Sequence, residues 1–214
     1  TLLRHTHGSE LRSSRDRLTL TLFRRSGWRP DLWYNAAMNI VERVLVAGDS
    51  HGDLRYMERL FDVAVEKNCD ALYVVGDFGF WPRPEELNAI PEFIRECSEY
   101  AENTDVDLYW LDGNHENHDR LLFDYVYPWF LFHAMAGVFP GPFIPITDRV
   151  SYAWRGSQWS WNGKRFMAVG GAYSVDKGRR VKYVSWWPEE EMTYGEAGRI
   201  LEGTRPGVDV MLAH

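Results

Sequence analysis

Three short polar motifs contain the residue types that could do chemistry in this sequence. They read GDSHG at residues 48–52, GDFG at residues 76–79 and GNHE at residues 113–116, and each closely follows an apolar run. A fourth apolar segment ends at His214. A lone Gly-Asp after a strand is usually a turn, and a lone buried histidine usually satisfies a hydrogen bond. Repetition of such motifs after successive apolar runs favours one shared site.

Together the motifs supply two carboxylates, an amide oxygen and two imidazoles, namely Asp49, Asp77, Asn114, His51 and His214. This donor set suits Mn, Fe, Zn or Mg better than Cu(I) or an iron–sulfur cluster. A carboxylate can bridge two cations, and cations about 3.5–4 Å apart can hold both an attacking hydroxide and phosphate oxygens. The predicted cofactors are therefore two divalent metal ions, with Mn favoured.

The segments around the motifs alternate between strand and helix patterns. Continuous apolar runs predict buried strands at 44–47, 71–75 and 108–111. Apolar residues at helical spacing predict helices at 54–64 and 87–100, with Pro91 marking a break in the second. Further predicted elements are a helix over 119–127, strands at 150–154 and 165–169, a helix from Trp187 to about Glu202 that stops at Gly203, and a strand at 208–213.

This order of elements predicts an α/β fold with two packed sheets and outer helices. In open α/β sheets, functional sites form at the carboxyl ends of the strands, where loops from neighbouring strands meet. The three motifs and His214 should therefore converge in space. We expect most of the ten tryptophans to be packing residues.

In motif order and residue type, the sequence resembles the calcineurin-like metallophosphoesterase superfamily over about residues 44–214. The resemblance implies an αββα sandwich of two mixed sheets flanked by helices, with a dinuclear metal centre between the sheets. It assigns Asp49 and His51 to the first metal, Asp77 to both, and Asn114 and His214 to the second. His115 would act as general acid or phosphate contact, and Glu116 would orient it by fixing its tautomer.

Departures from the family pattern refine the expectation. The family's final Gly-His-x-His does not occur before the sequence ends at His214. We therefore expect a sandwich that is C-terminally truncated and, in this form, weak in metal binding or inactive. No Asp-Arg-Gly follows Asp77, and Phe80 stands where purple acid phosphatases have a tyrosine, so both subclasses are disfavoured. Residues 170–188 resemble small phosphoesterases of actinobacteria and their phages.

Two arginines and two histidines outside the motifs have alternative interpretations. Arg179 or Arg180 could clamp a substrate phosphate through its planar guanidinium, or both could lie in a solvated basic loop. His118 and His133 match no motif position, so we expect a structural or surface role for them.

Charge is unevenly distributed along the chain. Residues 1–37 contain seven arginines and three acids, whereas the remainder has a formal charge of −11. We interpret residues 1–37 as a disordered or non-native extension, with Met38 as the natural start and 38–214 as the domain. The rival interpretation is a basic arm that binds nucleic acid. The two cysteines suggest no disulfide framework, and the cytoplasm is the default compartment. No apolar run reaches membrane-spanning length.

The predicted function is dinuclear-metal-dependent hydrolysis of phosphate esters, either monoesters or diesters, by a metal-bound hydroxide. The expected partner is a small phosphorylated substrate. A nuclease is less favoured, because an acidic surface opposes sequence-independent binding of nucleic acid. The alternative from another class is a non-catalytic scaffold of the same fold that binds a protein partner, although the intact ligand set argues against it.

Overall fold

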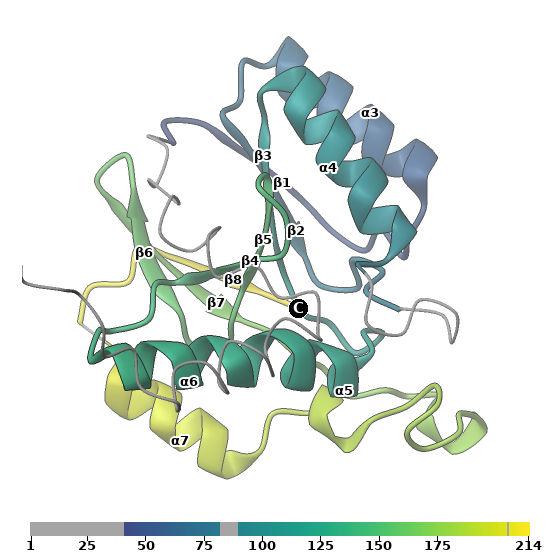
Figure 1. Ribbon diagram of the computed structural model, residues 1–214, viewed down its shortest axis with the longest axis vertical. Coiled ribbons are helices and arrows are strands. Elements are labelled where there is room, and N and C mark those ends of the chain that lie inside the picture. The colour runs from purple at the N-terminus through teal and green to yellow at the C-terminus, as the bar shows by residue number, and fades with distance from the viewer. Residues whose placement is uncertain (1–40, 82–89, 205) are drawn as a thin grey trace, which may run out of the picture.

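The computed structural model describes residues 41–81, 90–204 and 206–214, and its centre is a pair of facing β-sheets (Figure 1). The larger sheet has five strands in the order β1 (Val44–Ala47), β2 (Ala71–Val75), β3 (Asp107–Leu111), β5 (Val150–Ala153) and β4 (Phe143–Pro145). The first four strands in this order are parallel, and β4 is antiparallel to β5. The sheet therefore has the mixed character that was predicted.

The smaller sheet consists of β6 (Gln158–Trp161), β7 (Lys164–Val169) and β8 (Val210–Ala213), with β6 antiparallel and β8 parallel to β7. Aromatic side chains fill the space between the two sheets. Tyr73 stacks on Trp159 with ring centres 5.7 Å apart, and the rings of Tyr109 and Trp161 lie 5.1 Å apart. Both tryptophans are buried, so they pack the core as predicted.

Helices α3 (Leu54–Glu66) and α4 (Glu92–Thr104) lie side by side over the other face of the larger sheet (Figure 1). The Asp53 side chain caps α3 by accepting hydrogen bonds from two backbone N–H groups of its first turn. Helix α4 begins directly after Pro91, where the break was predicted. Position 87, which was included in the predicted stripe of this helix, lies outside the described residues.

Helix α7 (Tyr194–Gly203) packs beyond the smaller sheet, where Thr204 Oγ1 lies 3.8 Å from Met167 Sδ of β7. The layers therefore run helices, five-stranded sheet, three-stranded sheet, helix. This order confirms the predicted αββα sandwich. Cys69 and Cys97 are buried free thiols.

The helical segment that was predicted over 119–127 is longer in the structure. In the structure, α5 (His118–Leu121) continues through a π-helical turn (Leu122–Val126) into α6 (Tyr127–Ala136). Pro128 is the second residue of α6, in the first turn after the π-helical segment, where the regular hydrogen-bond ladder is already interrupted. Its missing N–H therefore does not end the helix.

The single helix predicted from Trp187 to Glu202 is also wrong. A 3₁₀ turn (Pro188–Glu190) is separated from α7 by three residues. Thr193 and Glu196 form a capping box that starts α7 at Tyr194. Glu190 instead turns into the interior and is fully buried. Gly203 is the last residue of the helix, close to the predicted stop.

The predicted burial of the first strand is only partly correct. β1 is an edge strand, and Val46 is 44% exposed. Strands β4 and β6 were not predicted.

The proposed extension 1–37 and its boundary at Met38 lie outside the described residues. Within the parts of the chain that the structure describes, no helix has the length and apolar character needed to cross a membrane.

Candidate metal centre

The carboxyl ends of β1, β2 and β3 lie at one edge of the larger sheet because the three strands are parallel and in register. Ala47 is paired with Val74, and Val75 with Leu111. The loops after these ends contain the three polar motifs. Strand β8 of the smaller sheet ends beside them, which brings in His214. The predicted convergence of all four segments is therefore observed.

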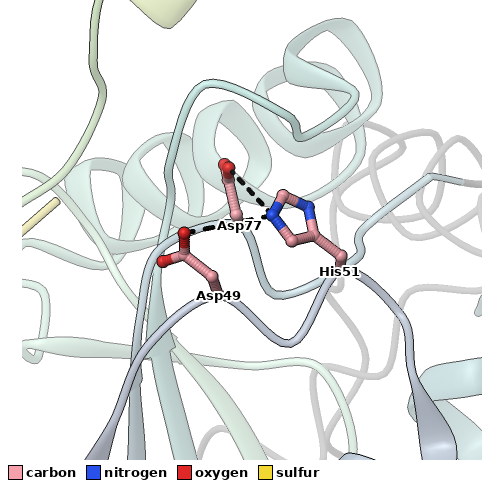
Figure 2. A group of neighbouring side chains, drawn as sticks. All are labelled: Asp49, His51 and Asp77. Atoms are coloured by element: carbon pink, nitrogen blue, oxygen red, sulfur yellow. Dashed lines mark ion pairs between the residues drawn. The ribbon is translucent and has the colours of Figure 1, made fainter.

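Asp49, His51 and Asp77 form the first group of potential ligands (Figure 2). His51 Nε2 lies 3.9 Å from Asp49 Oδ2 and 3.7 Å from Asp77 Oδ2. All three residues have positive φ angles, of 30°, 45° and 46° in sequence order. Such angles are uncommon for residues with a side chain and are concentrated at functional sites. These backbone conformations orient the three side chains toward one another.

His214, Asn114 and Asp77 form the second group. His214 Nδ1 lies 2.9 Å from the Val75 carbonyl oxygen, which can only accept, so a proton on Nδ1 has a partner there. In that tautomer the Nε2 lone pair faces Asn114 Oδ1 at 3.2 Å and Asp77 Oδ1 at 3.6 Å. A metal-bound histidine usually donates its other N–H to such a partner. Three electron-pair donors facing one another suit a bound cation.

Asp77 belongs to both groups. Its side chain is 4% exposed, with Oδ2 toward His51 and Oδ1 toward His214. Oδ1 also accepts the His115 N–H at 2.8 Å. A carboxylate held in this way can bind two cations, one through each oxygen. The oxygen and imidazole donors suit divalent Mn, Fe, Zn or Mg, and the residues present therefore fit the metals that were predicted.

Two glycines leave room for these ligands. A Cβ on Gly76 would lie 2.2 Å from the His214 ring, and one on Gly113 would lie 2.1 Å from Asp77 Oδ1. Both distances are far below van der Waals contact. The glycines of the motifs therefore allow the bridging carboxylate and His214 to approach the backbone closely.

We expect Gly113→Ala to weaken Mn²⁺ binding by at least about tenfold, because the new methyl group must displace the Asp77 carboxylate. The measurement is a calorimetric Mn²⁺ titration. Gly48→Ala is the matched control, since a Cβ there meets nothing within 4 Å. Equal Mn²⁺ affinity in the two variants would contradict the close-approach explanation.

His115 lies beside the first group of potential ligands. Its ring is 5.5 Å from the His51 ring and 5.9 Å from the Trp81 ring, centre to centre. Partial burial is the main cause that lowers the pKa of His115. The side chain is half-buried, so it can meet a molecule that approaches the predicted metals.

Glu116 does not lie as the resemblance implied. It is fully buried, and its carboxylate accepts backbone N–H groups from Phe78 at 2.7 Å and Gly113 at 2.6 Å. Among the described residues, no hydrogen bond joins it to the His115 ring. Burial, together with the charges of Asp77 and Asp112, raises the pKa of Glu116 to about 8. Glu116 therefore ties the loop after β2 to the loop after β3.

Asp112, which the motif analysis missed, is the centre of a second buried polar group. It accepts hydrogen bonds from Tyr152 Oη at 2.7 Å and Arg155 Nε at 2.8 Å. His118 is buried beside it and contacts the Gly113 carbonyl, as its predicted structural role requires. Burial is the main cause that lowers the pKa of His118 to about 4. The sequence feature that could have identified Asp112 is its position directly before Gly113 of the third motif.

Arg179 and Arg180 differ in environment. Arg179 is exposed, whereas the Arg180 side chain is only 10% exposed and pairs with Glu190 at 2.9 Å. The solvated-loop interpretation is wrong for Arg180. Its guanidinium is already engaged by Ser174 and Glu190, so it is not free to clamp a substrate phosphate.

A cavity of about 1190 Å³ lies elsewhere, between α6, α7 and the smaller sheet. Its lining includes Phe130, Ile200 and Arg199 but none of the seven predicted site residues. The convergent ligands identify the candidate site better than the size of this cavity does.

Comparison with known proteins agrees with this geometry. A family model described as calcineurin-like phosphoesterase matches residues 42–212. The chain belongs to this family, whose members generally hydrolyse phosphoesters with divalent metal ions. No curated protein matches at a significant level.

Two solved structures are similar in part. One, described as TT1561 of Thermus thermophilus, has 17% sequence identity and a TM-score of 0.38. The match covers 63% of this chain and 51% of that one, so the chain spans about half its length. A second structure has 15% identity and a TM-score of 0.38, with coverage of 78% of this chain and 66% of the other.

Proposed function

We propose that this protein hydrolyses phosphate esters at two divalent cations, with Mn²⁺ the favoured metal. Asp49, His51 and Asp77 would hold the first cation, and Asp77, Asn114 and His214 the second. The observation that carries the proposal is the position of Asp77, which turns one oxygen toward each group. When bound, such a pair of cations supplies an activated water at neutral pH and offsets charge on the phosphate oxygens.

The residues of the chain would prepare the site for this reaction. A His214 Nδ1 proton donated to the Val75 carbonyl would leave Nε2 free to bind the second cation. The His115 N–H holds Asp77 Oδ1 in place. The His115 side chain, beside Trp81, would contact the substrate phosphate or protonate the departing oxygen.

The proposed substrate is a small phosphorylated molecule, and a nucleic acid is less favoured because the formal net charge is −7. A reducing compartment such as the cytoplasm agrees with the two free cysteines. The assay described below distinguishes a phosphomonoester substrate from a phosphodiester substrate.

The test is hydrolysis of p-nitrophenyl phosphate and bis-p-nitrophenyl phosphate by the full-length protein. The metal-free protein, prepared with a chelator, is compared with the same sample after Mn²⁺ is added. We expect turnover that depends on Mn²⁺, and the preferred compound separates monoesterase from diesterase. A folded protein that binds Mn²⁺ but hydrolyses neither compound would favour the non-catalytic scaffold instead.

A further inference from the structure

Three polar side chains, two of them buried and one largely so, form a connected group beside Asn114. Ser174 is 1% exposed and Glu190 is fully buried, and the Arg180 side chain is 10% exposed. They come from the segment between β7 and α7, which follows the last motif by some sixty residues. Burying a charged pair and a hydroxyl here is costly unless each polar atom has a partner.

The hydrogen bonds in this group have only one consistent direction. Four donors face the Glu190 carboxylate: Ser174 Oγ, the Trp187 N–H at 3.2 Å, and both terminal nitrogens of Arg180. A carboxylate that receives four donors is held as an acceptor. The Ser174 hydroxyl has one proton, and it donates this proton to Glu190 Oε2.

Ser174 Oγ can then only accept from its other neighbours. Arg180 Nη1 donates to it at 2.8 Å, and the Asn114 side chain lies 3.0 Å away. The Asn114 group that faces Ser174 must therefore be the NH₂ group. Its amide oxygen consequently points the other way, toward His214 Nε2 and the site. Arg180 Nη2 also reaches the Asn114 backbone carbonyl, at 3.4 Å.

We propose that Ser174, held by Arg180 and Glu190, is a positioning residue that fixes the Asn114 amide with its oxygen toward the second cation. This inference rests on the proposed function, because it requires Asn114 to bind a metal. An asparagine amide is nearly symmetrical in shape, and a flip would present NH₂ hydrogens, which repel a cation. Within the Ser174 group, this orientation is the one that leaves the Ser174 hydroxyl proton on Glu190 and gives the Asn114 NH₂ group an acceptor.

The first test is Mn²⁺ binding to Ser174→Ala, measured by calorimetric titration and by electron paramagnetic resonance, which reports coupled Mn²⁺ pairs. We expect one Mn²⁺ to bind about 10–100-fold more weakly, the usual effect of losing a contact that orients a ligand. The affinity of the other Mn²⁺ should not change, and the coupled-pair signal should be lost at limiting Mn²⁺. Ser185→Ala is the matched control, because the Ser185 hydroxyl accepts the Val181 N–H and, among the described residues, makes no hydrogen bond to Ser174, Glu190 or Asn114.

The second test uses Glu190→Gln, alone and combined with Ser174→Ala. A glutamine NH₂ can donate to Ser174 and release the hydroxyl proton toward Asn114, which would favour the flipped amide. We expect Glu190→Gln to weaken the same Mn²⁺ site, and the double variant to be no weaker than Ser174→Ala. Such non-additivity indicates that the two residues act through one path.

The outcomes separate the two proposals. If the wild-type protein binds two Mn²⁺ ions and Ser174→Ala binds both with unchanged affinity, the positioning role is overturned and the proposed function stands. Equal weakening of both Mn²⁺ ions, or additive effects of the two substitutions, would also overturn it as a general structural effect. All of these titrations use the full-length protein, and a full-length wild type that binds fewer than two Mn²⁺ ions would overturn both proposals.

Discussion

Replacing Asp77 by asparagine is expected to lower Mn²⁺-dependent phosphoester hydrolysis by at least about 10²–10³-fold, the loss typical of removing one strong electrostatic contact to a transition state. Asparagine has the same shape, and its oxygen can still accept the His115 N–H that Asp77 Oδ1 accepts at 2.8 Å. The fold should therefore persist. What is lost is the negative charge and the second oxygen, which faces His51.

The measurements are turnover of bis-p-nitrophenyl phosphate and the number of Mn²⁺ ions bound. We expect Asp77→Asn to lose the bound pair as well as turnover. Asp148→Asn is the matched control, because Asp148 is exposed and lies outside the site. An Asp77→Asn protein that retains two Mn²⁺ ions and near-normal turnover would show that Asp77 is not the bridging ligand.

Replacing Arg155 by methionine is expected to lower the free energy of unfolding by about 3–5 kcal/mol, the usual loss when one partner of a buried ion pair is removed. Arg155 Nη2 lies 2.6 Å from Asp112 Oδ2, and the two side chains are 13% and 1% exposed. The variant leaves the Asp112 carboxylate buried without its counter-charge. Urea denaturation of the metal-free protein measures the loss.

The same variant should change the pH dependence of stability. Burial acts to raise the pKa of Asp112, but Arg155, His118 and the hydrogen bonds together hold this pKa below its ordinary value of 3.8. In the wild type, the contribution of ionised Asp112 to the free energy of unfolding is therefore complete above pH 3.8. It is lost only as the pH falls below this value. Without Arg155, burial raises the folded-state pKa, so protonation of Asp112 stabilises the variant as the pH falls.

The difference in unfolding free energy between wild type and Arg155→Met should thus become smaller as the pH is lowered from about 7 to about 5. Lys164→Met is the control, since Lys164 forms a solvent-exposed pair with Asp209 at 3.8 Å and should cost only about 0–1 kcal/mol. A loss of similar size in both variants, or a difference that does not depend on pH, would contradict this account.

Local sequence patterns predicted the elements that hold the site. The strands at 71–75 and 108–111 are recognisable because a buried parallel strand is apolar on both faces, and the edge strand at 44–47 has the same apolar composition. The motifs after them are recognisable because each contains a glycine, and Gly76 and Gly113 leave space for the His214 ring and the Asp77 carboxylate. Some local signals were available but not used. Asn162 and Gly163, both with positive φ, form the tight turn between β6 and β7.

The sequence by itself determined the fold class, the order of the strands that precede the three motifs and the candidate ligand residues, because these depend on the period and spacing of neighbouring residues. Only the tertiary structure decided which polar groups meet over long separations. Asp112 and Arg155 are 43 residues apart, and Asn114 and Ser174 are 60 residues apart. The contacts of Glu116 with the loop after β2 are likewise non-local. Such pairs are set by the packing of loops from two sheets, and no local spacing encodes them.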